Sequence, residues 1–190
     1  DETLRALDDL IRAGKVRYVG TSTFAAWQVL ESLWASKELG LNRFICEQPP
    51  YNLLDRRIER ELLPMAQTYG IATIPWSPLA GGLLTGKYRR GEEAPEGARY
   101  ADVEDKPWME RRMVEGIYDV VEFLDPIVEE KDCTMAQFAL AWVLNQPGVT
   151  SPIIGPRTME QLEDNLGAVD VEITDEDRKV IDGHIAPGSM

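Results

Sequence analysis

Short apolar segments alternate with amphipathic ones along most of the chain. The short segments are nearly continuous in apolar character, which is typical of strands buried on both faces. Between them, apolar residues recur at the spacing of a helix face. Because this alternation of strands and helices requires crossover connections, it predicts the parallel sheet of an α/β protein. The expected strands are residues 16–21, 44–48, 71–76 and 151–154.

The helical segments have recognisable ends. Thr134 and Thr158 each precede a glutamine by three residues, which is the spacing of a capping box. Gly40 and Gly70 stand where a left-handed residue can end a helix. The chain opens in a helical pattern, and further helices are expected at residues 24–39, 58–69, 109–130, 134–145, 158–166 and 175–182.

Two features interrupt this rhythm. Residues 88–107 are rich in Gly, Glu, Pro and Arg and show little periodicity, which predicts a long surface loop. Within the helical pattern that follows, Asp125 precedes Pro126, and this pair predicts a stop. The chain also begins inside a helix at Asp1 rather than at a methionine, so we expect it to be part of a longer chain.

Composition narrows the classes of function. The 190 residues carry a formal net charge of −13, which argues against a nucleic-acid or anionic-membrane partner because both attract basic surfaces. No apolar stretch is long enough for a transmembrane helix. Cys46 and Cys133 match no metal or redox spacing. We therefore expect one metal-free domain with reduced thiols, located in the cytoplasm.

Each expected strand ends in polar or conformationally special residues. In a parallel α/β fold the carboxyl ends of the strands meet at one edge, where ligands bind. A simpler role for Ser22 and Thr23 is to cap the next helix, and capping is compatible with ligand contact. The residues at this edge are Thr21, Ser22, Thr23, Glu47, Gln48, Trp76, Ser77, Gly155, Pro156 and Arg157.

Two segments have features of a phosphate site. Gly81 and Gly82 permit a ligand to approach the backbone, with Lys87 nearby, although taken alone two glycines more often mark a plain turn. Arg157 precedes a predicted helix N-terminus, where free amides and a guanidinium favour an anion, and a solvated arginine is the alternative. His184, the only histidine, lies in the expected tail and is no candidate for a general base.

Four segments in succession resemble the aldo-keto reductase family. The resemblance implies a (β/α)8 TIM barrel that binds NADP(H) without the GxGxxG motif, which this chain lacks. Residues 1–190 would then be the C-terminal half of a single barrel domain with four parallel strands, and its partner would be the missing N-terminal half. The matching segments are GKVRYVGTS (14–22), QPPYN (48–52), IPWSPLAGGLLTGKY (74–88) and IIGPRTMEQLEDN (153–165).

The same resemblance implies a cofactor site. Ser22 and Gln48 would bind the nicotinamide carboxamide and Trp76 would stack on the ring. Thr23 stands beside them at a position that is often Asn in the family, with a shorter reach than an amide. Near the phosphates and the adenine the resemblance places Ser77, Pro78, Leu79, Gly81, Leu84, Lys87, Gly155, Arg157, Gln161 and Asn165.

The catalytic Asp, Tyr, Lys and His of the family come from its first four strands, and none of those motifs is present, so no catalytic residue is assigned here. We expect part of an NADP(H)-dependent oxidoreductase that reduces aldehydes or ketones, with the cofactor-binding half supplied by this chain and no activity in this chain alone. The alternative is an NADPH-binding regulatory subunit of the same fold, like the potassium-channel β subunits. A half-barrel that pairs with itself is a third possibility.

Overall fold

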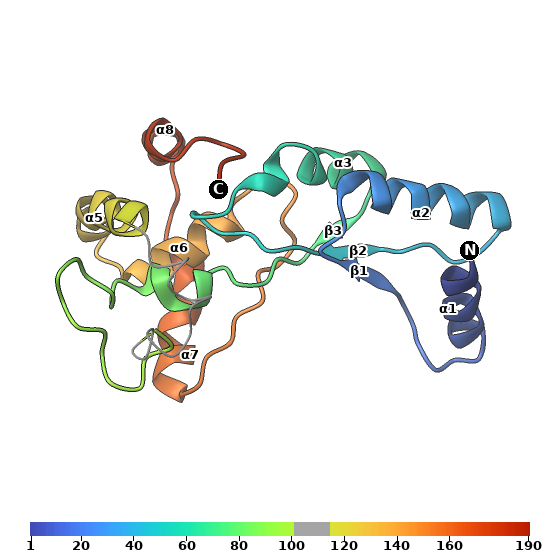
Figure 1. Cartoon of the computed structure of the whole chain (residues 1–190), viewed down its shortest axis with the longest axis horizontal. Coiled ribbons are helices and arrows are strands. Elements are labelled where there is room, and N and C mark those ends of the chain that lie inside the picture. Colours follow the sequence, from blue (N-terminus) through green and yellow to red (C-terminus); the bar gives the residue numbers. More distant parts are fainter. Residues whose placement is uncertain (101–114) are drawn as a thin grey trace.

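The chain forms a small parallel sheet with helices around it (Figure 1). The structure is a computed structural model, and it describes residues 1–100 and 115–190. Strands β1 (Gly20–Ser22), β2 (Cys46–Gln48) and β3 (Ala72–Thr73) pair in parallel and in chain order. This arrangement confirms the predicted α/β class and brings the carboxyl ends of all three strands to one edge.

The two faces of the sheet differ in polarity and burial. Thr21, Glu47 and Thr73 are neighbours in the strand register and are all buried, so their face packs against helices. Ser22 and Gln48 alternate with them, as side chains do along a strand, and therefore point to the opposite, more open face. The residues expected to meet a ligand thus share the open face.

The expected fourth strand at residues 151–154 is not formed, which corrects the predicted four-stranded sheet. The segment lies beside β3, since Thr150 N–H donates to the Thr73 carbonyl and Ile153 N–H to the Pro75 carbonyl, each at 2.8 Å. Pro75 has no amide hydrogen, so it interrupts the ladder between these two bonds. The segment therefore has the position of a strand without its regular pairing.

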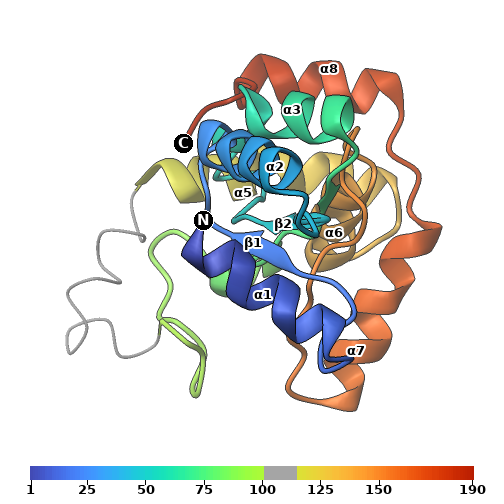
Figure 2. The same cartoon turned by 90° about the vertical axis from the view of Figure 1, so that its right-hand side faces the viewer.

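Helices α1 (Glu2–Arg12), α2 (Ala26–Leu39) and α3 (Leu62–Tyr69) belong to the half of the chain that carries the sheet. Figures 1 and 2 show α2 and α3 side by side along the sheet. Gly40 and Gly70 end these two helices in the left-handed conformation, as predicted. The buried residues between α2 and α3 are Ala26, Val29, Leu33, Leu62, Met65, Ala66 and Ile71.

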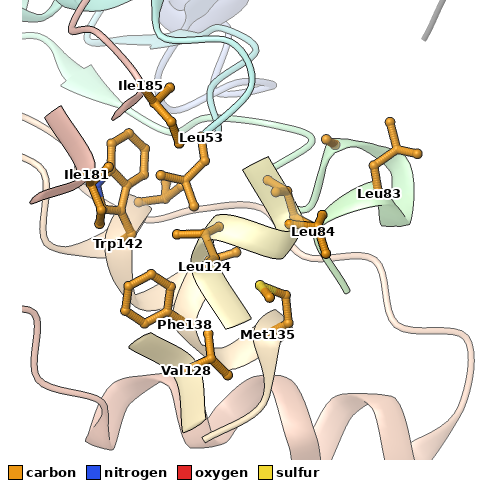
Figure 3. Close-up of a cluster of buried hydrophobic side chains, with 14 of the residues drawn as sticks. Leu53, Leu83, Leu84, Leu124, Val128, Met135, Phe138, Trp142, Ile181 and Ile185 are labelled. Atoms are coloured by element: carbon orange, nitrogen blue, oxygen red, sulfur yellow. The ribbon is translucent and has the colours of Figure 1, made fainter. Parts of the chain in front are cut away.

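The larger core lies among α5 (Glu115–Glu130), α6 (Met135–Leu144) and α8 (Asp175–His184), and α7 (Met159–Leu166) packs against α6 outside this core. Helix α6 is central because every residue from 135 to 143 except Gln137 is buried. Short 3-10 helices η1 (Arg57–Glu59), η2 (Ala80–Thr85) and η4 (Gly167–Asp170) complete the elements of the described residues. Figure 3 shows the core side chains Leu53, Leu83, Leu84, Leu124, Val128, Met135, Phe138, Trp142, Ile181 and Ile185.

Local chemistry explains where the helices begin. At α6 the capping box is complete, since Thr134 Oγ1 accepts the Gln137 amide and the Gln137 side chain accepts the Thr134 amide. At α7 the hydroxyl of Thr158 accepts the Gln161 amide, but the Gln161 side chain accepts the Arg157 amide instead. The predicted starts of both helices are therefore confirmed, but at Thr158 only one of the two hydrogen bonds of the capping box is formed.

The structure corrects the predicted helix stop at Pro126 and describes only part of the predicted loop before this helix. Helix α5 continues through Pro126, so the predicted stop is wrong, because Leu124 and Val128 on either side of the proline are buried in the core. The predicted start of this helix at residue 109 lies outside the described residues. Of the predicted loop at 88–107, residues 88–100 are described and form no helix or strand.

A buried arginine links the loop after β2 to the C-terminal helix. The Arg56 side chain is 3% exposed and pairs with Glu59 at 2.8 Å and with Asp182 of α8 at 2.7 Å. It also donates to the Ile185 carbonyl at 2.5 Å and lies 5.0 Å from the centre of the Trp142 ring. A buried guanidinium of this kind is stable only because its donors are satisfied.

Replacing Arg56 with alanine should lower the free energy of unfolding by about 3 kcal/mol, because the carboxylate of Glu59 and the Ile185 carbonyl would lose a buried partner. Arg57→Ala is the matched control, since Arg57 is half exposed and, among the described residues, forms its ion pair with neighbouring Asp55. Its effect should stay within about 0.5 kcal/mol. Urea unfolding of both variants gives the comparison, and equal losses would show that the Arg56 cluster has no special role.

Candidate functional site

The loop after β1 bends sharply toward β2. Thr23 has a positive φ of 60°, and its amide donates to the Gln48 carbonyl at 3.2 Å. The Ser22 hydroxyl donates to the same carbonyl at 2.9 Å. Helix α2 begins only at Ala26, with Ala25 in the cap position, so Ser22 and Thr23 do not cap it. The simpler capping role is therefore excluded, and the Ser22 hydroxyl lies exposed next to Gln48.

The loop after β3 comes to the same edge. Trp76 N–H donates to the Pro49 carbonyl at 2.9 Å, and Trp76 forms an isolated parallel bridge with Pro50. The next residue, Ser77, also has a positive φ, 58°. Buried Asn52 supports it by donating from Nδ2 to the Ser77 carbonyl at 2.9 Å. These bonds bring Trp76 close to the end of β2, as the predicted site requires.

A cleft of about 670 Å³ opens between the loop after β3 and the start of α7. Most of the predicted site residues line it, whereas Ser22, Thr23 and Gln48 stand outside its lining at the ends of β1 and β2. Leu84 is fully buried in the core, so its side chain does not reach the cleft. The predicted residues in the lining are Trp76, Ser77, Pro78, Leu79, Gly81, Lys87, Gly155, Arg157, Gln161 and Asn165.

Glycine is required on one wall of the cleft. Gly81 and Gly82 have φ values of 71° and 105°, in the region that L-residues with side chains rarely adopt. A Cβ atom at Gly81 would stand 2.8 Å from the Tyr100 hydroxyl, and one at Gly82 would stand 3.3 Å from Lys87 Nζ. The glycines thus let the loop after η2 pack close against the backbone, with the Lys87 ammonium beside it.

Three cations converge on this cleft. Burial lowers the pKa of the Lys87 ammonium, and the positive charges of Arg157 and Arg99 lower it further. Arg99 also lines the cleft. The sequence gives no signal for this residue, because Arg99 stands in an aperiodic loop with no fixed spacing to other site residues. In a chain of net charge −13 this local positive cluster favours an anionic ligand.

The rest of the cleft offers binding groups rather than proton donors. Asp164, the one acid among its lining residues, is already the acceptor of the Thr134 hydroxyl. His184 lies in the last turn of α8, stacked on Phe123 with ring centres 3.9 Å apart, so it is ordered rather than in a tail and is absent from the lining. No group of three or more metal-binding side chains occurs within the described residues.

Together these features define an α/β protein with a cationic cleft next to the carboxyl edge of a parallel sheet. The comparison with protein families identifies the class: the Aldo/keto reductase family matches residues 1–186, and the chain belongs to that family. The family has a (β/α)8 barrel, and the three-stranded parallel sheet is consistent with part of one.

Several curated proteins are similar to the chain. The uncharacterized oxidoreductase YrpG of Bacillus subtilis is 38% identical over 188 residues, which cover 99% of this chain and 54% of that protein. A probable voltage-gated potassium channel subunit beta of Arabidopsis thaliana is 40% identical over 172 residues, with 90% and 52% covered. A putative aryl-alcohol dehydrogenase of Schizosaccharomyces pombe is 34% identical over 190 residues, with 98% and 51% covered. The chain thus spans about half the length of these relatives. Within the described residues, no helix has the length and apolarity needed to cross a membrane.

Gly82→Ala should destabilise the protein by about 1 kcal/mol, because alanine disfavours a φ of 105° and its Cβ would press on Lys87. Gly183→Ala is the control: Gly183 lies in α8 with open space around its Cβ position, and alanine there should be neutral or stabilising. Thermal unfolding of the two variants gives the sign of each effect. A neutral Gly82→Ala would mean that this loop relaxes freely.

Proposed function

We propose that this chain supplies the NADP(H)-binding part of an oxidoreductase that reduces aldehydes or ketones to alcohols. The observation that carries the proposal is the cluster of Lys87, Arg99 and Arg157 around a cleft next to the carboxyl edge of the sheet. Phosphate groups are the ligands that such a cluster favours. Family membership and the relatives named as an oxidoreductase and an aryl-alcohol dehydrogenase support the reaction class.

The nicotinamide end of the cofactor fits the residues at the ends of the strands. The Ser22 hydroxyl uses its hydrogen on the Gln48 carbonyl and lies 3.4 Å from the Thr23 hydroxyl, which leaves one lone pair to accept from the carboxamide NH₂. The Gln48 side chain, half-buried on the open face of the sheet, offers both a donor and an acceptor to the same group. Half-buried Trp76 presents a flat apolar surface for the ring, and Thr23 stands beside Ser22.

The phosphates and the adenine fit the residues of the cleft. Near the pyrophosphate we place the backbone of Ser77 to Leu79, with Gly81 permitting close approach and Lys87 supplying charge. Arg157 stands just before α7, where it would meet the 2′-phosphate, next to Gly155. Gln161 accepts the Arg157 amide and so fixes the approach to the helix. The remaining proposed contacts are Asn165 near the adenine and Arg99, which the sequence reasoning did not include.

The part of the chemistry that belongs to these residues is binding and orientation. The bound nicotinamide would supply the hydride for the carbonyl substrate. The residues of this chain would hold the ring in one orientation and neutralise the phosphates. We assign the proton donor to the part of the barrel outside this chain. We also place the protein in the cytoplasm, a location with which the two free thiols, Cys46 and Cys133, agree.

A second candidate function is an NADPH-binding regulatory subunit with little turnover. The similarity to potassium channel subunit beta proteins of Arabidopsis thaliana and Oryza sativa, each 40% identical over 172 residues, favours it specifically. Both functions use the same cofactor site. Turnover of aldehydes by the full-length protein separates them.

Arg157→Ala should weaken NADPH binding by about tenfold and leave NADH binding unchanged, since only NADPH carries the 2′-phosphate that forms charge-assisted hydrogen bonds. Fluorescence titration of the full-length protein with both cofactors measures the effect. Arg17→Ala removes the same charge from an exposed position before β1 and serves as control. Equal weakening of both cofactors would reject the assignment of Arg157 to the 2′-phosphate.

The 190-residue chain expressed alone should show no carbonyl reduction and should self-associate. General acid catalysis is worth about 10² to 10⁴ in rate, and we assign the proton donor to the part of the barrel outside this chain. Strand β1 is the edge of the described sheet, so its outer backbone groups are available for pairing with other chains. An NADPH-oxidation assay and size-exclusion chromatography check both points, and a monomer that reduces an aldehyde would contradict them.

A further inference from the structure

A row of buried polar side chains crosses the sheet on its helix-facing side. Thr21 pairs in register with Glu47, and Glu47 with Thr73. Glu47 and Thr73 have no exposed surface at all. Neither Glu47 Oε2 nor Thr73 Oγ1 has a hydrogen-bond partner among the described residues. Three apolar side chains would fill this layer without the cost of burying polar atoms that lack hydrogen bonds. The presence of a carboxylate here therefore calls for an explanation other than packing.

Burial of the Glu47 carboxyl is unfavourable for its ionised form. Burial raises the pKa of Glu47, and the hydroxyl of Thr21 and the backbone amides of Phe24 and Thr23 oppose that rise only in part. Replacing buried ionic groups by apolar residues of similar volume is often neutral or stabilising. Glu47 is therefore poorly explained as a contribution to the stability of the fold.

The other carboxylate oxygen has a defined partner. Phe24 N–H donates to Glu47 Oε1 at 3.0 Å, across the turn that connects β1 to α2. Directly before Phe24 stands Thr23, in the left-handed conformation at φ 60°, which is unfavourable for a β-branched residue. The bond at Phe24 fixes the chain just after this turn, while the bonds from Ser22 and Thr23 to the Gln48 carbonyl fix it just before.

We propose that Glu47 is a positioning residue for cofactor binding: by accepting the amide of Phe24 it holds the left-handed turn at Thr23 and so presents Ser22 and Thr23 to the nicotinamide carboxamide. The inference rests on the proposed cofactor site. It adds to that site a residue on the helix-facing side of the sheet, which acts on the cofactor only through the loop. Glu47 and Gln48 then act on opposite faces of β2. Glu47 holds the loop after β1, and Gln48 binds the nicotinamide carboxamide.

The geometry makes a selective prediction. The turn at Thr23 lies at the nicotinamide end of the proposed site, whereas the cations lie at the phosphate end. Loss of the Glu47 acceptor should therefore weaken ligands that carry nicotinamide and spare 2′,5′-ADP, which carries only the adenosine phosphates. A merely structural role would weaken both ligands together.

The test compares Glu47→Leu, which removes the acceptor at similar volume, with Glu47→Gln, which keeps an oxygen for the Phe24 amide. Both are made in the full-length protein that contains this chain and are titrated with NADPH and with 2′,5′-ADP. We expect Glu47→Leu to bind NADPH about tenfold more weakly, the value of one hydrogen bond to a charged group, with 2′,5′-ADP unchanged. Glu47→Gln should bind both like the wild type.

Hydrogen exchange supplies a readout that needs no cofactor. The segment 21–26 should exchange faster in Glu47→Leu than in the wild type, and Glu47→Gln should restore its protection. Should Glu47→Leu fail to fold, Glu47→Asp keeps the charge but withdraws the acceptor by one methylene, and the same selective loss is expected.

The outcomes are distinguishable. A wild-type protein that binds neither NADPH nor 2′,5′-ADP refutes the proposed function, and the inference about Glu47 falls with it. A wild type that binds both, with equal loss of the two ligands or no loss in Glu47→Leu, leaves the proposed function intact and overturns the inference. Unchanged exchange at residues 21–26 in Glu47→Leu also overturns it.

Discussion

The parallel pairing of β1, β2 and β3 is the constraint on which the candidate site depends. Because the strands run in the same direction and in chain order, the loops that follow them leave the sheet at one edge. Ser22, Gln48 and Trp76 come from three separate segments, and only this pairing makes them neighbours. An antiparallel arrangement of the same segments would put one of them at the far end of the sheet.

Buried polar groups then give this edge its detailed shape. Asn52 supports Ser77 and Glu47 supports the turn at Thr23, and both loops contain a non-glycine residue with positive φ. Such conformations persist only where the surroundings fix them, and they concentrate at functional sites. Arg56 has a different role, since its partners lie in η1, in α8 and just after α8, and it connects distant parts of the chain rather than a site loop.

The negative net charge of the chain places a further condition on the proposed binding of a phosphorylated cofactor. A chain of net charge −13 repels anions at long range, so an anionic cofactor needs a local field of opposite sign. Lys87, Arg99 and Arg157 supply it within a partly desolvated cleft, where charge interactions are screened less than on an open surface. A bound phosphate, as the proposed cofactor carries, would relieve the mutual repulsion of these three side chains and so favour the ligand-bound state.

The sequence by itself determined what depends on neighbours along the chain: the helix starts at Thr134 and Thr158, the glycine stops at 40 and 70, the α/β class and the family. It also named most residues of the cleft, because the motif at 74–88 is continuous in sequence. Only the tertiary structure decided that Leu84 is buried, that Arg99 reaches the cleft, that α5 passes through Pro126 and that residues 151–154 lack regular strand pairing. The physical reason is that each of these outcomes depends on contacts between segments far apart in the chain, where packing and partner geometry outweigh local propensity.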